Sequence, residues 1–169
     1  LDREMEGFGC LQTSSEEAQF KIVEHLIVEH DCRDIVYIRG PLNYKEADKR
    51  FEGYCEALKK YGIPYREEYV YTGAFTLESG IQSVVEMEQE GIKPQAILCA
   101  NDSMAIGVLE YYKRKGVRVP EDVMLAGFDN GETAKYSSPS ITSIDKNPYE
   151  LGRTAIYEIQ KTIDGKKPE

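Results

Sequence analysis

The chain has 169 residues, enough for one domain of ordinary size that needs neither disulfides nor a metal ion to fold. Its 21 Lys and Arg residues and 30 Asp and Glu residues give a net charge of −9, which disfavours nucleic-acid binding because phosphates attract basic surfaces. Hydrophobic residues make up 41% and charged residues 30%, as in globular chains and unlike disordered ones. No apolar run is long enough to span a bilayer, so we expect no membrane partner.

Cysteine usage indicates a reducing compartment. The four cysteines are Cys10, Cys32, Cys55 and Cys99. None of them forms a CxxC pair, and only His25 and His30 could join them at a metal ion. We therefore predict free thiols, a cytoplasmic location, no zinc site and no other cofactor.

Short apolar runs alternate with amphipathic stretches along the chain. The pattern predicts helices at about residues 16–30, 44–61, 77–90 and 103–115, and strands at 35–38, 69–71, 96–100, 123–128 and 141–144. A last helix begins at Asn147-Pro148, where a capping residue precedes Pro at the first helical position. This alternation predicts an α/β fold with a mostly parallel sheet.

Parallel sheets of this kind bind ligands at the carboxyl ends of their strands, so the residues after each apolar run are the candidate site. These segments are Arg39-Gly40-Pro41, Thr72-Gly73-Ala74-Phe75, Asn101-Asp102, Asp129-Asn130 and Asp145-Lys146-Asn147. Amides and carboxylates accept and donate in fixed directions, which suits a polyhydroxylated ligand. An aromatic ring suits the CH face of a sugar.

A set of motifs in fixed order resembles a known family. The motifs include Cys99-Ala100-Asn101-Asp102-Ser103-Met104-Ala105-Ile106-Gly107, Val119-Pro120-Glu121-Asp122-Val123, Gly127-Phe128-Asp129-Asn130, Ser138-Pro139-Ser140-Ile141-Thr142-Ser143-Ile144 and Pro148-Tyr149-Glu150-Leu151-Gly152. Together they resemble the effector-binding domain of the lactose/galactose repressor (LacI/GalR) family of bacterial transcription regulators, over about residues 8–165. That domain is similar to periplasmic sugar-binding proteins.

The resemblance implies a type I periplasmic-binding-protein-like fold, truncated at its amino terminus. Residues 1–31 and 146–169 would belong to a partial amino-terminal subdomain, and residues 32–145 would form a nearly complete carboxyl-terminal subdomain. We expect residues 32–144 to form the compact core, with the first and last helices less well anchored. The implied partners are a small-molecule effector, a second copy in a homodimer, and operator DNA through a helix-turn-helix upstream of Leu1.

The resemblance also implies which side chains contact the effector. Arg50, in an R-x-x-G-aromatic motif, would donate to sugar hydroxyls, and its alternative is a solvated helix arginine. Either Asn101 or Asp102 can cap the following helix, and we expect Asp102 to cap while Asn101 contacts the ligand. Asp129 would accept from the sugar, unless it is a plain turn residue before Asn130-Gly131.

Three further candidates have alternative structural roles. Phe75 would lie against the sugar face, or pack as an ordinary loop aromatic. Glu17 would contact the ligand, although Ser14-x-x-Glu17 also matches a capping box that would occupy its carboxylate. Lys146, where the chain would cross between subdomains, would contact the ligand and favour an acidic or phosphorylated one.

An enzyme is disfavoured because the chain has no GxSxG, no GxxxxGK[ST], and no GxGxxG after a strand. The predicted function is the ligand-sensing domain of a transcription regulator that binds a sugar or related metabolite in a cleft between subdomains. The alternative is an extracytoplasmic sugar-binding protein that serves a transporter. The segment upstream of Leu1 would separate them, as a helix-turn-helix in one case and a signal peptide in the other.

Overall fold

The computed structural model describes residues 14–165, which fall into two units. Residues 15–144 form one compact unit, and residues 145–165 of the described chain belong to the other. The first unit contains α1 (Ser15–Val28), β1 (Ile35–Arg39), α2 (Lys45–Lys60), a 3-10 turn η1 (Glu67–Tyr69), β2 (Val70–Thr72), α3 (Leu77–Gln89), β3 (Ala96–Cys99), α4 (Asp102–Lys115), β4 (Met124–Asp129), α5 (Glu132–Lys135) and most of β5 (Thr142–Asp145). The second contains α6 (Pro148–Ile163).

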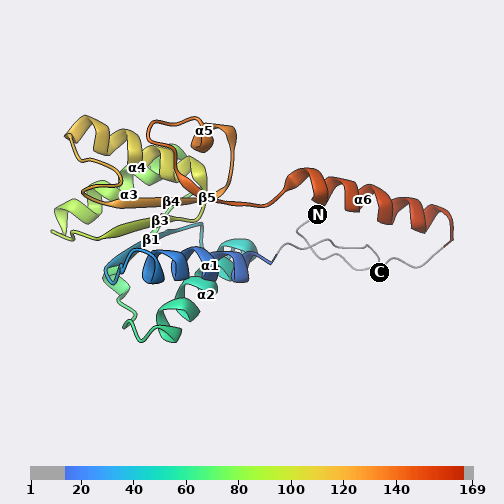
Figure 1. Cartoon of the computed structure of the whole chain (residues 1–169), viewed down its shortest axis with the longest axis horizontal. Helices are drawn as coiled ribbons and strands as arrows, with labels where there is room; N and C mark the ends of the chain where they lie inside the picture. Colours follow the sequence, from blue (N-terminus) through green and yellow to red (C-terminus); the bar gives the residue numbers. More distant parts are fainter. Residues whose placement is uncertain (1–13, 166–169) are drawn as a thin grey trace. The chain divides into compact units, whose positions relative to one another are not determined.

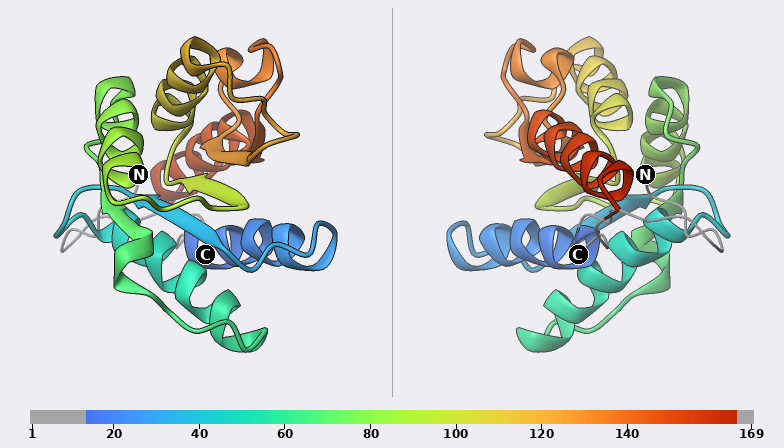
Figure 2. Two further views of the ribbon diagram at one scale, coloured as in Figure 1. Left: turned by 90° about the vertical axis from the view of Figure 1, so that its left-hand side faces the viewer. Right: turned by 90° about the vertical axis from the view of Figure 1, so that its right-hand side faces the viewer.

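The five strands form one sheet in the order β2-β1-β3-β4-β5. β1 pairs in parallel with β2 and with β3, and β3 pairs in parallel with β4, so that Val36 lies beside Ile97 and Ile97 beside Leu125. Helices α1 and α2 cover one face of the sheet and α3 and α4 cover the other (Figures 1 and 2). Strands covered on both faces are apolar throughout, which explains the continuous apolar runs of β1 and β3. The predicted α/β fold with a parallel sheet is confirmed.

Helix α1 is an integral part of the compact unit. Its apolar stripe, Ile22, Val23, Leu26 and Ile27, is buried. The helix crosses α2 at Gly53, where an added Cβ would lie 2.2 Å from the carbonyl oxygen of Glu16. Helix α1 therefore belongs to the compact unit, which begins at Ser15. The subdomain boundary after residue 31 and the weaker anchoring of the first helix stay predictions. The compact unit ends at Ile144.

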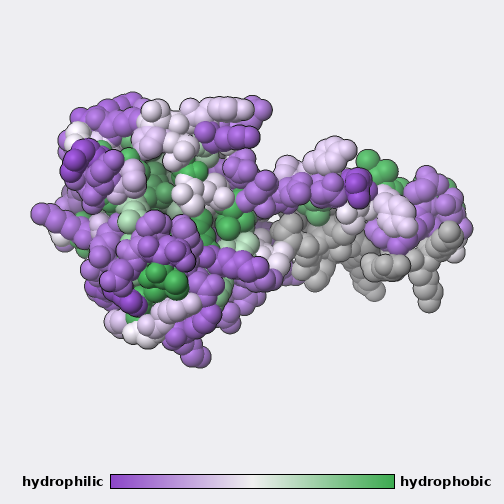
Figure 3. Space-filling view, viewed as in Figure 1, coloured by the Kyte–Doolittle hydropathy of each residue, from purple (hydrophilic) through white to green (hydrophobic). Residues whose placement is uncertain are grey.

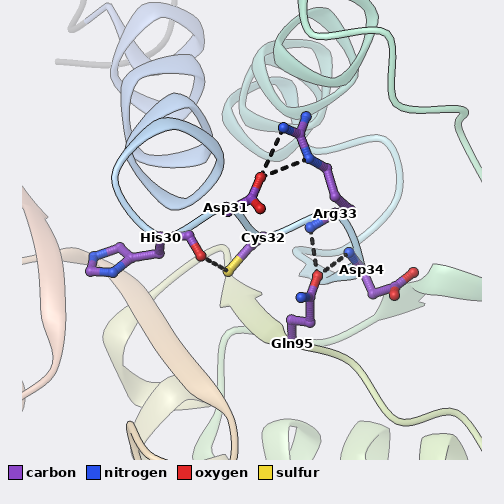
Figure 4. A network of polar contacts seen from close by, with 6 residues as sticks. All are labelled: His30, Asp31, Cys32, Arg33, Asp34 and Gln95. Carbon is purple, nitrogen blue, oxygen red and sulfur yellow. Dashed lines mark hydrogen bonds and ion pairs between the residues drawn. The ribbon is translucent and has the colours of Figure 1, made fainter.

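A polar network fixes the start of β1 beside the start of β3 (Figure 4). The backbone N–H groups of Arg33 and Asp34 donate to Oε1 of Gln95 at 2.6 and 3.0 Å, and the backbone N–H of Gln95 donates to the carbonyl of Asp34 at 2.8 Å. Arg33 also pairs with Asp31 at 2.9 Å. Because the amino ends of these parallel strands are aligned, their carboxyl ends meet at the opposite edge of the sheet.

The cysteines of the described chain, Cys32, Cys55 and Cys99, are free thiols. Cys10 lies outside the described residues. Between residues 14 and 165, no three His, Cys, Asp or Glu side chains gather in a group that could hold a metal ion. On the face shown in Figure 3, hydrophilic side chains predominate over the compact unit. No helix in the described range is long and apolar enough to cross a membrane.

The second unit contains α6, which begins as predicted. Asn147 is the N-cap, its side chain accepts from the backbone N–H of Glu150 at 3.3 Å, and Pro148 occupies the first helical turn. Several large apolar side chains of α6 are exposed, among them Ile156, Ile159 and Ile163.

Candidate functional site

Four loops meet at the carboxyl edge of the sheet. They follow β1 at Arg39, β2 at Thr72, β3 at Cys99 and β4 at Asp129. Backbone bonds join the first three, since Gly73 donates to the carbonyl of Arg39 at 2.8 Å and Ala100 donates to that of Ile38 at 2.9 Å. The edge is therefore a continuous surface of loop backbone, onto which side chains from α2 and the loops project.

Arg50 lies under this edge, near the middle of α2. Only 4% of the residue is exposed, so the alternative of a solvated helix arginine is wrong. Its Nη1 donates to the carbonyl of Ala100, and its guanidinium carbon lies 4.0 Å from the ring centroid of Phe128 and 5.8 Å from that of Phe75. Its Nε is buried and has no hydrogen-bond partner within the described chain. The planar guanidinium of Arg50 is held against two aromatic rings, and its Nε–H remains available as a donor. This arrangement is suited to bind an acceptor oxygen.

Phe75 is fixed in an unusual backbone conformation. Its φ is 61°, a left-handed value that is uncommon for a bulky residue and persists only where neighbours enforce it. Asn101 supplies one constraint, because its Nδ2 donates to the carbonyl of Phe75 at 3.0 Å. Gly40 leaves room for the Phe75 ring, since an added Cβ there would lie 2.3 Å from Cζ of Phe75. The ring of Tyr44 completes the enclosure, edge-on with centroids 5.5 Å apart.

The expected helix cap is wrong, because Asn101 and not Asp102 caps α4, whereas a ligand contact by Asn101 stays a prediction. Asn101 is the N-cap of α4, because its backbone is extended (φ −153°) and its Oδ1 accepts from the N–H of Met104 at 3.0 Å. Asp102 is the first helical residue. Its side chain is instead buried, and it accepts from the N–H of Gly131 at 2.7 Å and from Ser143 Oγ at 2.6 Å. This burial raises the pKa of the Asp102 carboxyl.

Asp129 ends β4 with a left-handed φ of 111°. It lines a cavity of about 300 Å³. Asp102, Thr76, Ser103 and Ile106 also line this cavity. Thr76 directly follows Phe75, so the cavity adjoins the aromatic part of the site. Carboxylate and hydroxyl oxygens beside an apolar wall can bind a small molecule with several hydroxyl groups.

Of the six predicted site residues, the contacts bring Arg50, Phe75 and Asn101 together, with Asp129 in the adjoining cavity. Glu17 lies on the exposed side of α1, 2.6 Å from Lys21 Nζ and with 62% of its side chain exposed. Lys146 belongs to the second unit. A ligand contact by either residue stays a prediction, as does the capping box at Ser14.

Sequence reasoning missed three residues that shape the site. Tyr44, Phe128 and Ser143 each contact a candidate residue or its neighbour. The only sequence signal for Tyr44 as a site residue was its position as an aromatic residue three places after Pro41. Phe128 and Ser143 stood inside motifs that were quoted for the resemblance, but no pattern in the sequence predicted which contacts they make.

A parallel α/β unit with polar and aromatic groups gathered at its carboxyl edge is a small-molecule-binding architecture. The chain belongs to the periplasmic binding protein-like domain family, whose model matches residues 23–169.

Its relatives are transcription regulators. The chain is 31% identical over 159 residues to the HTH-type transcriptional repressor PurR of Pasteurella multocida (strain Pm70), covering 94% of this chain and 47% of that protein. A solved LacI-family sugar-binding transcriptional regulator from Escherichia coli, complexed with phosphate, matches with a TM-score of 0.88 and 28% identity over 94% of this chain and 58% of that one. The transcriptional regulator CelR in complex with cellobiose matches with a TM-score of 0.83 and 30% identity over 90% and 46%. The resemblance to the lactose/galactose repressor family is confirmed, and the chain spans about half the length of these relatives.

Proposed function

We propose that this chain is the ligand-sensing domain of a bacterial transcription regulator and that it binds a sugar or a related small metabolite at the carboxyl edge of its sheet. The observation that carries the proposal is the buried guanidinium of Arg50, enclosed by Phe128 and Phe75 in a family whose relatives are repressors. The solved complex of CelR with cellobiose supports a sugar as the ligand class.

Each proposed contact follows from the chemistry of the side chain. Arg50 donates to ligand hydroxyls from the edge of its guanidinium, where Nε has no hydrogen-bond partner within the described chain. Asp129 accepts from a vicinal hydroxyl, and Phe75 packs on the CH face of the ring. Asn101 caps α4 through its oxygen and positions Phe75 through its nitrogen, and it is kept as a ligand contact at the same edge. Glu17 and Lys146 are kept as further contacts, the latter suited to an acidic or phosphorylated effector.

Regulation requires a second wall and a DNA-binding part. A ligand that binds one arrangement of two subdomains better than another shifts their equilibrium by the difference in affinity, and so changes operator affinity. In this proposal the regulator acts in the cytoplasm as a homodimer, reads operator DNA through a helix-turn-helix outside this chain, and is not an enzyme. The alternative, a sugar-binding protein of a transporter, is disfavoured because the relatives are repressors.

Thermal unfolding against a ligand panel tests the proposal. The panel contains cellobiose, monosaccharides, sugar phosphates and nucleosides. A ligand at 100 times its dissociation constant stabilises the protein by about 2.7 kcal/mol, a rise of several degrees in the melting temperature. We expect Asp129→Asn to reduce the rise, whereas Glu56→Gln, a substitution of an exposed carboxylate on α2, should leave it unchanged. A folded protein that no member of the panel stabilises would contradict the assigned ligand class.

A further inference from the structure

Four residues form a closed polar cluster beside Asp129. They are Asp102, Asn130, Gly131 and Ser143, here called the Asp102 cluster. The carboxylate of Asp102 accepts from Gly131 N–H at 2.7 Å and from Ser143 Oγ at 2.6 Å, and Ser143 Oγ in turn accepts from Asn130 N–H at 2.9 Å. The cluster therefore joins the start of α4, the segment after β4 and the strand β5.

The segment that the cluster binds is strained. Asp129 and Asn130 have φ values of 111° and 50°, so two consecutive residues without glycine's freedom are left-handed. Such conformations cost free energy and persist only where surrounding contacts enforce them. The two residues after Asp129 are those whose N–H groups the Asp102 cluster satisfies.

The missing side chain at Gly127 leaves room for the carboxylate of Asp102. Asp102 is 6% exposed, and an added Cβ at Gly127 would lie 2.3 Å from its Oδ1. Gly127 belongs to the Gly-Phe-Asp segment that ends in Asp129. The absence of a side chain at Gly127 thus admits the carboxylate that binds the next turn of the same segment.

We infer that Asp102 is a positioning residue: through Gly131 and Ser143 it fixes the backbone that presents Asp129 to the ligand. The inference rests on the proposed function only in taking Asp129 as a ligand contact. The two adjacent residues at the start of α4 then position different parts of the site, because Asn101 fixes Phe75 and Asp102 fixes Asp129. Displacement of β5, the strand that leads into the second unit, would also disturb the bond from Ser143 to Asp102.

The charges that face this carboxylate explain why removal of its partners matters. Burial raises the pKa of Asp102, and the like charge of its ionisable neighbour Asp129 raises it further. The hydrogen bonds from Ser143, Gly131 and Phe128 lower it. A buried carboxylate beside another one depends on these donors, and Ser143 supplies one while it also accepts from Asn130.

Site-resolved amide hydrogen exchange tests the inference without any ligand. Ser143→Ala removes the hydroxyl that links Asn130 to Asp102. We expect the Asn130 amide to exchange about fivefold faster, the change that loss of one typical hydrogen bond produces, and Gly131 to follow in the same direction. The amides of Leu98 and Ala126 in the centre of the sheet should keep their rates. Ser143→Thr, which retains the hydroxyl, should restore protection at Asn130.

Ser137→Ala is the matched control. Ser137 lies in the same connection between β4 and β5, and its hydroxyl donates to the carbonyls of Ala134 and Pro139 outside the Asp102 cluster. The inference is overturned if Ser143→Ala and Ser137→Ala give equal rates at Asn130, or if Ser143→Ala accelerates Leu98 and Ala126 as much as Asn130.

A titration with cellobiose, the disaccharide of one solved relative, adds the link to binding. If cellobiose binds, Ser143→Ala should weaken its binding. The double variant with Ser143→Ala and Asp129→Asn should bind cellobiose no more weakly than Asp129→Asn alone. Additive losses would overturn the link through Asp129. If no member of the ligand panel binds, the proposed function fails, whereas the exchange experiment still decides whether Asp102 fixes this segment.

Discussion

The side-chain amide of Asn101 donates to the carbonyl of Phe75 at 3.0 Å, across a separation of 26 residues. The same side chain caps α4 through its oxygen. One residue therefore caps the helix that follows a buried strand and also holds a strained aromatic residue on the neighbouring loop. The candidate site depends on α4 for its shape as much as on the residues expected to touch a ligand.

Substitution at Asn101 can separate its two bonds. Asn101→Asp keeps a good capping oxygen but loses the donor to Phe75, whereas Asn101→Ala loses both. We expect Asn101→Ala to lower the free energy of unfolding by about 1–2 kcal/mol, and Asn101→Asp by less. Urea unfolding measures both values. Equal losses in the two variants would mean that the bond to Phe75, and not the cap, provides the stability.

We expect that lysine cannot replace arginine at position 50 without loss of stability. Lysine keeps the charge but lacks the planar group that packs 4.0 Å from the Phe128 centroid and donates to Ala100. We expect Arg50→Lys to lower the free energy of unfolding by about 1–2 kcal/mol, from the lost cation–π contact and the altered hydrogen bond. Arg114→Lys, at an exposed position on α4, is the control and should change it little. A loss of equal size in both variants, measured by urea unfolding, would contradict this account of Arg50.

The spacing of apolar residues predicted the helices and strands of this fold well, because that spacing reflects which side chains of each helix or strand are buried. The strands β1 and β3 are apolar on both faces, and α2 carries its apolar residues at spacings of three and four. The start of α6 was equally predictable, since Asn147-Pro148 is a local signal. Local signals of this kind need no knowledge of the rest of the molecule.

Sequence patterns did not predict the features that depend on a neighbouring element. The cap at Asn101 depends on which of two adjacent residues has the extended backbone, and the short side chains of both allow either role. The burial of Arg50 depends on Phe128, which is far away in the sequence. The packing of α1 depends on the missing side chain at Gly53. None of these facts is visible in the periodicity of the element concerned.

The crossing of α1 and α2 makes Gly53 intolerant of a side chain. An added Cβ would lie 2.2 Å from the backbone oxygen of Glu16, and backbone atoms cannot rotate away as a side chain can. We expect Gly53→Ala to lower the free energy of unfolding by about 1–3 kcal/mol. Gly152→Ala in α6, with no atom within 4 Å of the added Cβ, is the control and should not lower it. Denaturant unfolding that leaves Gly53→Ala as stable as the original protein would contradict the close crossing.

Stability in acid should depend on Asp122. Three donors from Arg118, its backbone N–H, Nε and Nη2, contact the carboxylate at 2.8, 3.0 and 2.6 Å. They lower the pKa of Asp122 to about 2 in the folded protein. Because the folded pKa lies below the unfolded one, this contribution to stability is complete above the unfolded pKa and is lost as the pH falls towards about 2. We expect the free energy of unfolding of Asp122→Asn to fall less steeply than that of the original protein over this range, whereas Glu56→Gln should follow the original protein. Identical slopes for Asp122→Asn and the original protein, from urea unfolding at a series of pH values, would show that Arg118 does not bind this carboxylate in solution.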